Sequence, residues 1–232
     1  PDLQMFDDKT FGINPDDKVA LARAAAGEVM GKNDRLISVE TSYSDGENAS
    51  YRLMSNGFEG ESKSTWYSVS ASVAIKGEGE ARPSDYWYGS SLFYDKLPKT
   101  DIGSVALERV LRKLGQKKAK SGKYTMVVDP INSGRMLSPV LSALYGSSLQ
   151  QKNSFLIDKL DQKVFSDKLT VMDDPHVIGA NGSRYFDNEG VATEHRPIFE
   201  NGVLKTYFFD TYNAKKMGVA PTISGPSRLV LT

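Results

Sequence analysis

A strict alternation of side chains between residues 64 and 75 constrains the fold of this chain more than any other feature. The odd positions of 65–75 hold Thr, Tyr, Val, Ala, Val and Ile, whereas serine occupies four even positions from 64 to 72. Because successive side chains of a β-strand point to opposite faces, the pattern predicts one strand with a buried face and a small polar outer face. Half-buried strands of this kind are typical of antiparallel sheets.

Turn signals around this strand predict a meander of antiparallel strands. Asn56-Gly57 is a strong hairpin dipeptide, and Asp45-Gly46 indicates a further turn. Gly77-Glu78-Gly79 lacks the third glycine and the following helix of a phosphate-binding loop, so it is interpreted as a hairpin turn. The other strands expected in this half of the chain cover residues 36–43, 49–55 and 85–88.

Two helices are expected to flank the meander. The first covers 15–30, with Asn14 as its N-cap and a proline at its first position. The second covers 101–114, with Thr100 as its cap and Gly115 ending it. Beyond residue 123 we expect a short buried strand at 124–128, a helix at 132–145 interrupted by Pro139, partial helix at 149–160, a strand at 169–172, an Asn-Gly hairpin at 198–204 continued by 206–209, and a helix at 210–217.

Strands in meanders with intervening helices, rather than regular βαβ units, predict an α+β fold with mainly antiparallel sheets. The organisation divides into two parts. Residues 1–123 hold a helix, the meander and a second helix, and residues 124–232 hold a strand, helices and the Asn-Gly hairpin.

Composition excludes several classes of function. Lys+Arg and Asp+Glu both number 29, and this balance argues against a dedicated binder of nucleic acid or anionic membranes. No apolar run approaches the length of a membrane span. The sequence has no cysteine, which excludes disulfides, thiol nucleophiles and cysteine-ligated zinc within it. A cytoplasmic location fits this composition.

The residues alone give no clear catalytic constellation. The sequence has two histidines and neither a His-Glu-x-x-His nor a Gly-x-Ser-x-Gly motif, so no serine has an identifiable base. His176 lies beside Asp173 and Asp174 and is interpreted as a loop histidine bonded to a carboxylate. His195 lies in a charged extended segment and is expected to be exposed. A metal site built from His176, His195 and carboxylates stays open as an alternative.

Two further features each allow a functional and a structural interpretation. The segment 107–123 carries seven basic residues against one acidic residue, as a phosphate-binding patch or the solvated end of a helix would. The aromatic run Tyr86-Trp87-Tyr88 fits a stacking platform, but alternating aromatic residues on a strand more often pack in cores and interfaces.

One long motif stands out in the second half of the chain: the segment 182–193, Gly-Ser-Arg-Tyr-Phe-Asp-Asn-Glu-Gly-Val-Ala-Thr, followed by Glu200-Asn201-Gly202-Val203-Leu204-Lys205 and by residues 207–210. With this motif the chain resembles the TldD/PmbA family, whose members were once labelled modulators of DNA gyrase. The resemblance covers nearly the whole chain. Its other matches are Ser55-Asn56-Gly57-Phe58, Asp85-Tyr86-Trp87-Tyr88, Asn153 to Asp158, Asp173-Asp174-Pro175 and Tyr212 to Gly218.

The resemblance implies a role in a two-subunit metalloprotease. TldD–TldE (PmbA) complexes of this family act on unfolded peptides, including modified-peptide precursors and an antitoxin. The TldD subunit holds zinc through a His-Glu-x-x-x-His helix and a later cysteine. In this sequence Ser138 and Ala143 stand at the two histidine positions and Pro139 at the glutamate position.

The resemblance therefore implies a cytoplasmic TldE/PmbA-like subunit with no catalytic residue and no metal ligand of its own. Zinc is expected in a TldD-like partner, an extended peptide is the expected substrate, and no membrane is involved. The peptide-binding residues are unknown. Family chains begin earlier and continue beyond Ser224-Gly225-Pro226, so N- and C-terminal parts are expected to be missing. The alternatives are an autonomous metallopeptidase and a nucleic-acid-associated regulator resting on the basic segment 107–123.

Overall fold

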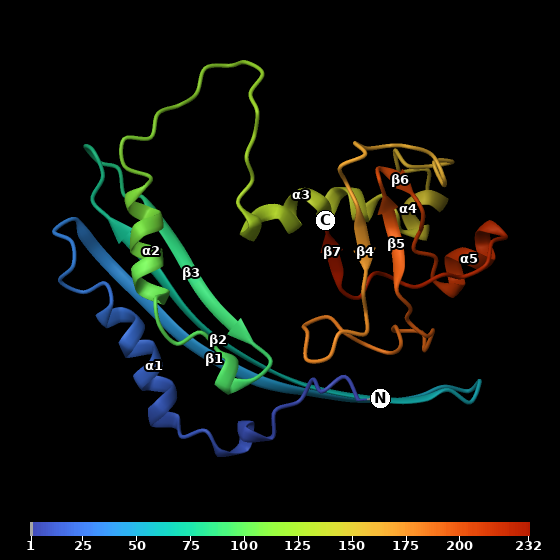
Figure 1. Ribbon diagram of the computed structural model, residues 1–232, viewed down its shortest axis with the longest axis horizontal. Helices are drawn as coiled ribbons and strands as arrows, with labels where there is room; N and C mark the ends of the chain where they lie inside the picture. Colours follow the sequence, from blue (N-terminus) through green and yellow to red (C-terminus); the bar gives the residue numbers. More distant parts are fainter. Residues whose placement is uncertain (1) are drawn as a thin grey trace. The chain divides into compact units, whose positions relative to one another are not determined.

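The computed structural model describes residues 2–232 and divides into two compact units. The meander unit comprises residues 5–50 and 62–122, and the motif unit comprises residues 2–4, 51–61 and 123–232. Each unit has its own sheet and its own hydrophobic core. The fold is α+β with antiparallel sheets, as the sequence predicts (Figure 1).

The meander unit is a three-stranded sheet in the order β1-β2-β3, with two helices packed on one face. β2 pairs antiparallel with β3, so that Val69 lies opposite Gly89. The tip of the β1–β2 hairpin, residues 51–61, belongs to the motif unit. The elements are the short 3-10 helix η1 (Asp8–Gly12), α1 (Pro15–Gly27), β1 (Leu36–Leu53), β2 (Glu59–Ile75), β3 (Ser84–Ser91), η2 (Tyr94–Lys96) and α2 (Ile102–Leu111).

The alternation in β2 builds the core of this unit. Every odd residue from 65 to 75 is buried, whereas Trp66 and Ser72 on the other face are exposed. The buried aliphatic side chains pack against Ala25 of α1 and Ala106 of α2 in one cluster. The prediction of a strand with a buried face and a polar outer face is therefore confirmed.

The two helices of this unit approach each other closely at the start of α2. The Glu28 carboxylate, just after α1, accepts the backbone N–H groups of Asp101 (2.9 Å), Gly103 (2.7 Å) and Ser104 (3.1 Å). A Cβ atom at Gly103 would lie 2.1 Å from the carbonyl oxygen of Ala25, so only glycine fits there. The predicted cap, Thr100, is wrong, because a carboxylate from another helix satisfies the first amides of α2.

The turn predicted at Asp45-Gly46 is wrong, because β1 continues through it without a break. A Cβ atom at Gly46 would lie 2.8 Å from Nε1 of Trp66, so this glycine makes room for an indole on the neighbouring strand. The hairpin turn is at Asn56-Gly57, where Gly57 has φ +89° and Met54 bonds Phe58 across the turn. The dipeptide signal was correct at this position because a glycine with positive φ is needed there.

The motif unit is built around a four-stranded sheet in the order β6-β5-β4-β7. Its core contains Leu144, Phe199 and Phe208, all fully or almost fully buried, with Leu137 and Val140 of α3 packed against it. The elements are α3 (Pro130–Ser142), α4 (Gly146–Gln150), β4 (Val171–Asp173), β5 (Arg196–Glu200), β6 (Val203–Leu204), α5 (Thr211–Met217) and β7 (Leu229–Leu231).

The predicted strand at 124–128 is wrong. These residues form no strand, and Met126 and Val127 are 66% and 92% exposed. Their β-forming composition is not enough, because a strand forms only where a neighbouring strand of the sheet pairs with it. α3 begins at Pro130, six residues after the start of this segment, and the Asp129 side chain accepts the N–H of Ile131 at 3.0 Å.

Three elements of the motif unit also differ from the prediction. Only residues 146–150 of the region around 149–160 are helical, and 206–209 contains an isolated bridge from Phe208 to Tyr145 instead of a strand. β7 was not expected. The Asn201-Gly202 hairpin and the helix closed by Gly218, with φ +69°, are confirmed.

A loop without regular secondary structure, residues 161–169, runs along the Asn201-Gly202 hairpin. The Gly202 N–H donates to Leu169 at 2.8 Å, and its carbonyl accepts from Val164 at 2.8 Å and Phe165 at 3.1 Å. A Cβ atom at Gly202 would lie 2.3 Å from the Phe165 carbonyl oxygen. Glycine therefore allows the loop to lie directly against the hairpin turn.

Within residues 2–232, no helix is long and apolar enough to cross a lipid bilayer.

Candidate functional site

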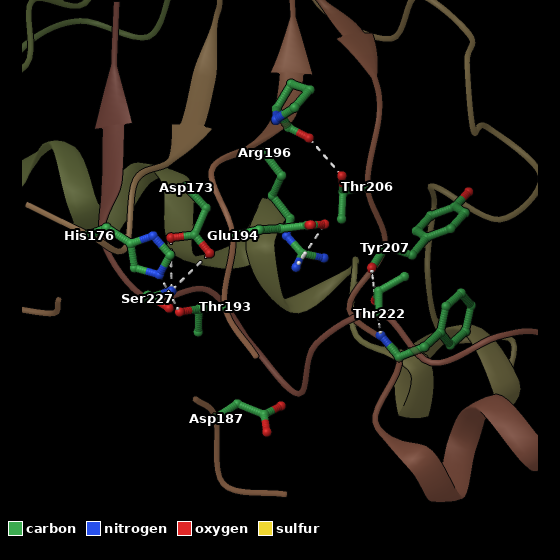
Figure 2. A network of polar contacts seen from close by, with 12 residues as sticks. Asp173, His176, Asp187, Thr193, Glu194, Arg196, Thr206, Tyr207, Thr222 and Ser227 are labelled. Atoms are coloured by element: carbon green, nitrogen blue, oxygen red, sulfur yellow. Dashed lines mark hydrogen bonds and ion pairs between the residues drawn. The ribbon is translucent and has the colours of Figure 1, made fainter. Parts of the chain in front are cut away.

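The family-like motif folds into a polar network at one end of the motif unit's sheet (Figure 2). Asp173, the last residue of β4, is fully buried. Its carboxylate accepts the N–H of Ser227 at 3.0 Å and the N–H of Arg228 at 2.8 Å. A buried carboxylate is stable only when such donors replace water, so Asp173 fixes the turn before β7.

Asp187 is a second buried carboxylate that fixes a turn, here within the motif 182–193. It is 2% exposed and accepts the backbone N–H groups of Glu189 (2.8 Å), Val191 (2.9 Å) and Ser224 (2.8 Å). Burial opposes ionisation of this carboxyl, but the donors from Ser224, Glu189 and Val191 outweigh it and hold the pKa of Asp187 below its ordinary value. Asp187 is therefore an ionised anchor that closes the 187–191 turn.

The hairpin tip packs against this turn. Phe58 and Phe186 meet edge to face with ring centroids 5.1 Å apart, and Arg52 donates to the carbonyls of Asp187 and Asn188. A Cβ atom at Gly190 would lie 2.9 Å from the Phe58 ring. The glycine of the motif is thus needed for an aromatic contact.

Arg184 shows how this unit satisfies a guanidinium group. Its Nε donates to the Ser227 hydroxyl at 2.9 Å, and its Nη2 donates to the carbonyls of Gly225 at 2.8 Å and Pro226 at 3.1 Å. Together with Asp173, this arginine holds residues 225–228 from two sides. The Asp173 carboxylate and the Arg184 guanidinium thus both use their hydrogen bonds to order this loop, so neither group is available as an acid or a base.

His176 takes part in the network through Thr193. The Thr193 hydroxyl donates its one proton to the Arg184 carbonyl, and His176 Nε2 lies 3.0 Å from the same oxygen. Because that proton is already used, His176 must be the donor in this pair. The imidazole also packs on Tyr185 with centroids 5.4 Å apart. The predicted carboxylate partner of His176 is therefore wrong, since its partner is a threonine hydroxyl.

Arg196, at the start of β5, is the least satisfied charged group of the network. Its side chain is 11% exposed, and its ion-pair partner is Glu194, 3.2 Å away and 72% exposed. The Nε atom is buried and meets no hydrogen-bond acceptor among residues 2–232. This arginine differs from Arg184 in having a donor to spare.

The positions aligned with a zinc-binding helix lie on α3 and just after it. Ser138 and Pro139 are exposed, whereas Ala143 is 6% exposed and belongs to the core. None of the three side chains is a zinc ligand in proteins, so this helix does not fit the metal. Within residues 2–232, the structure brings no three His, Asp or Glu side chains together as a metal site, and His195 is exposed.

The basic segment 107–123 is divided in the structure. Arg109 and Lys113 lie 3.5 and 3.2 Å from the Asp85 carboxylate, and Arg112 pairs with Glu108. The four lysines from 117 to 123 are exposed. The positive charge is therefore partly neutralised at the helix and concentrated in the segment that follows it.

The aromatic run on β3 also differs from its structural interpretation. Trp87 faces the core side and carries the Arg109 guanidinium 5.3 Å from its ring, but Tyr86 and Tyr88 are 45% and 42% exposed. The two tyrosine rings stack with centroids 6.4 Å apart on the open face of the sheet. Alternation placed only the central residue inward.

Sequence reasoning did not single out Asp173, Arg184, Asp187 or Arg196 as site residues. The motifs 173–175 and 182–193 contained three of them, but only as matches to a family. Nothing in the sequence indicates that Asp173 and Ser227, which are 54 positions apart, meet, because sheet pairing between β4 and β7 brings them together.

Two family models match the chain in succession. Residues 8–114 match the PmbA/TldA metallopeptidase central domain, and residues 121–230 match the PmbA/TldA metallopeptidase C-terminal domain. The two matches together take in most of the chain, and the break between them lies in the exposed segment that follows α2.

Curated relatives extend over nearly the whole chain. The chain is 31% identical to a metalloprotease PmbA homolog of Haemophilus influenzae, over 96% of this chain and 49% of that protein. It is 27% identical to metalloprotease PmbA of Escherichia coli, again over 96% of this chain and 49% of the relative. The chain thus spans about half the length of the curated relatives it matches.

Solved structures agree on the fold. A Bacteroides thetaiotaomicron protein described as a candidate modulator of DNA gyrase is 66% identical, with a TM-score of 0.98 over 100% of this chain and 53% of that chain. TldE from Thermococcus kodakarensis is 20% identical, with a TM-score of 0.71 over 95% of this chain and 52% of that one. The second likeness concerns the fold alone.

Proposed function

We propose, from the premise that this chain belongs to the PmbA/TldD family, that it is the subunit without metal in a TldD–TldE-type metalloprotease. Its substrate would be an unfolded or modified peptide, and its zinc-bearing partner would be a TldD-like chain. Its own part would be to build the partner interface and to shape the chamber that admits the peptide. The complex would act in the cytoplasm.

The observation that carries the proposal is the chemistry of α3 and the residue after it. Water activation by zinc needs three protein ligands and a general base. Ser138, Pro139 and Ala143 provide neither, and Ala143 is committed to the core of the motif unit. These three positions therefore supply neither a zinc ligand nor a general base.

The polar network supports a role as scaffold. The carboxylate oxygens of Asp173 and Asp187 accept hydrogen bonds from backbone N–H groups, and these bonds rigidify the two loops that the side chains close. A carboxylate used in this way is a poor general base, because its lone pairs are already occupied. A network that holds two loops in place in this way fits a scaffold better than a reaction centre.

Cleavage by reconstituted complexes tests the proposal. Full-length protein mixed with a zinc-bearing TldD-like chain should cut an unfolded peptide, and a chelator should stop the reaction. The TldD-like chain alone should be markedly less active. Equal activity with and without this subunit would contradict the proposal.

Metal analysis separates the proposal from an autonomous metallopeptidase. After dialysis, the purified protein should hold no stoichiometric zinc, because its α3 offers no ligand. One tightly held zinc per chain, together with chelator-sensitive cleavage by this protein alone, would favour the alternative built on His176 and His195.

A role near nucleic acid has one supporting observation, the exposed lysines between 117 and 123. The net charge of the chain is zero, and Asp85 and Glu108 neutralise the helical part of the segment. We expect DNA binding to be weak in about 150 mM salt. Submicromolar affinity with a steep salt dependence would revive this candidate.

A further inference from the structure

We propose that Arg196 is a binding site for the carboxylate of a peptide ligand, and that Glu194 occupies this site in the free protein. The proposal concerns binding by this chain alone and does not rest on the metalloprotease function. It starts from the contrast between two arginines of the same network, Arg184 and Arg196.

The Arg196 side chain is 11% exposed, and its Nε atom is buried without the acceptor that burial requires. A buried charge is costly unless it is paired and hydrogen-bonded. Arg184 meets this condition with hydrogen bonds to one hydroxyl and two carbonyl oxygens, but the Arg196 Nε atom has no acceptor among the described residues. Arg196 therefore keeps one unused donor, Nε, in a position largely shielded from water.

The neighbouring buried carboxylate does not supply the missing acceptor. Asp173 and Arg196 are directly opposite each other in the β4–β5 pair, which places their Cβ atoms on one face. Asp173 nevertheless directs both oxygens to the backbone of Ser227 and Arg228. The charge of Arg196 is thus left to Glu194 (Figure 2).

Glu194 is suited to being displaced. It lies two residues before Arg196, its side chain is 72% exposed, and it approaches the guanidinium at a single ion-pair distance of 3.2 Å. Because the Glu194 carboxylate lies mostly in water, it returns to full solvation at small cost when an incoming carboxylate takes its place. The acid already in place indicates the chemistry of the ligand, because a guanidinium and a carboxylate form charge-assisted hydrogen bonds.

The experiment follows the Nε–H signal of Arg196 by NMR in the full-length protein at constant ionic strength. The probes are acetyl-glutamate amide, which has only a side-chain carboxylate, and acetyl-glutamine with a free C-terminal carboxylate. Acetyl-glutamine amide is the uncharged control. We expect a saturable shift of this signal with at least one of the two acids, and the acid that acts identifies the source of the carboxylate.

Two variants make the proposal falsifiable. Glu194→Gln removes the internal competitor, and we expect about fivefold tighter binding of the acid. Arg196→Lys should lose saturable binding, whereas Arg228→Lys should retain it. Arg228 is the matched control because its ion pair with Asp174 is 3.9 Å long and about one-third exposed on both sides.

The proposal would be overturned if neither acid produced a saturable shift, if acetyl-glutamine amide acted equally, or if Glu194→Gln left the affinity unchanged. If Arg196→Lys fails to fold, the comparison of the parent protein with Glu194→Gln still decides. Because no partner or metal is used, failure here leaves the proposed subunit role untouched, and failure of the subunit role leaves this site untouched.

Discussion

Replacing Glu28 by alanine should destabilise the meander unit far more than replacing an ordinary surface glutamate would. Three backbone N–H groups at the start of α2 bond to this side chain at 2.7–3.1 Å. The first amides of a helix have no partners within the helix, and a negative charge there also opposes the positive end of the helix dipole. Alanine would remove all three acceptors and the charge together.

The expected loss is about 2–3 kcal/mol in the free energy of unfolding. Loss of a capping side chain costs about 0.5–2 kcal/mol, and a hydrogen bond to a charged group contributes about 1.5–3 kcal/mol. The three bonds share one carboxylate and water can reach part of the site, so the contributions do not add in full. Glu28→Gln keeps one acceptor oxygen and should fall between the parent protein and Glu28→Ala.

Urea unfolding followed by tryptophan fluorescence measures this loss in the right unit. Both tryptophans of the chain, Trp66 and Trp87, belong to the meander unit, so the signal reports on its unfolding. Glu108→Ala is the matched control, because this α2 glutamate makes only an exposed i,i+4 pair with Arg112, and it should cost at most about 0.5 kcal/mol. If Glu28→Ala costs no more than this control, the reasoning about the cap is refuted.

Three further changes test other parts of the structure. Asp187→Asn should lower the free energy of unfolding by about 2 kcal/mol at neutral pH. Because folding lowers the pKa of Asp187, the stability that its carboxylate contributes is present above pH about 4 and is lost as pH falls through the pKa of the folded state. When unfolding is measured at decreasing pH, the variant should therefore lose less stability than the parent protein. Gly202→Ala should cost about 1–3 kcal/mol more than Gly57→Ala in thermal or urea unfolding, because both glycines have positive φ but a Cβ is obstructed only at 202; equal losses would contradict this. Tyr43→Phe should be neutral or slightly stabilising in urea unfolding, since the buried hydroxyl has no acceptor among the described residues, and a loss above about 1 kcal/mol would show that the hydroxyl is satisfied.

The parts of the fold that depend on local periodicity were predictable. The burial of alternate residues in β2 and the Asn-Gly turns follow from side-chain direction and from backbone conformations that glycine favours. Gly46 shows the limit of this reasoning, because its dipeptide resembles a turn but its position serves the packing of Trp66. A local signal cannot tell a glycine needed for its φ from one needed for its missing side chain.

The network in the motif unit could not be predicted for a different reason. Asp173 and Ser227 are brought together only when β7 joins the sheet beside β4, and three-residue strands carry too little periodicity to be recognised. The segment 124–128 is the opposite case, because its composition favours a strand but the structure pairs it with no other strand among residues 2–232. In both cases the pairing between strands, which local sequence does not encode, decided the outcome.

The loop at 161–169 has a consequence for the kinetics of amide exchange. It has no helix or strand, yet the amides of Asp161, Val164 and Phe165 donate to carbonyls of the Asn201-Gly202 hairpin and β6 at 2.8–3.1 Å. Those protons can meet solvent only when the hairpin itself separates from the loop, so they should exchange with deuterium at the rate of the sheet. A segment that is irregular in its backbone should therefore count among the slowly exchanging parts of the molecule.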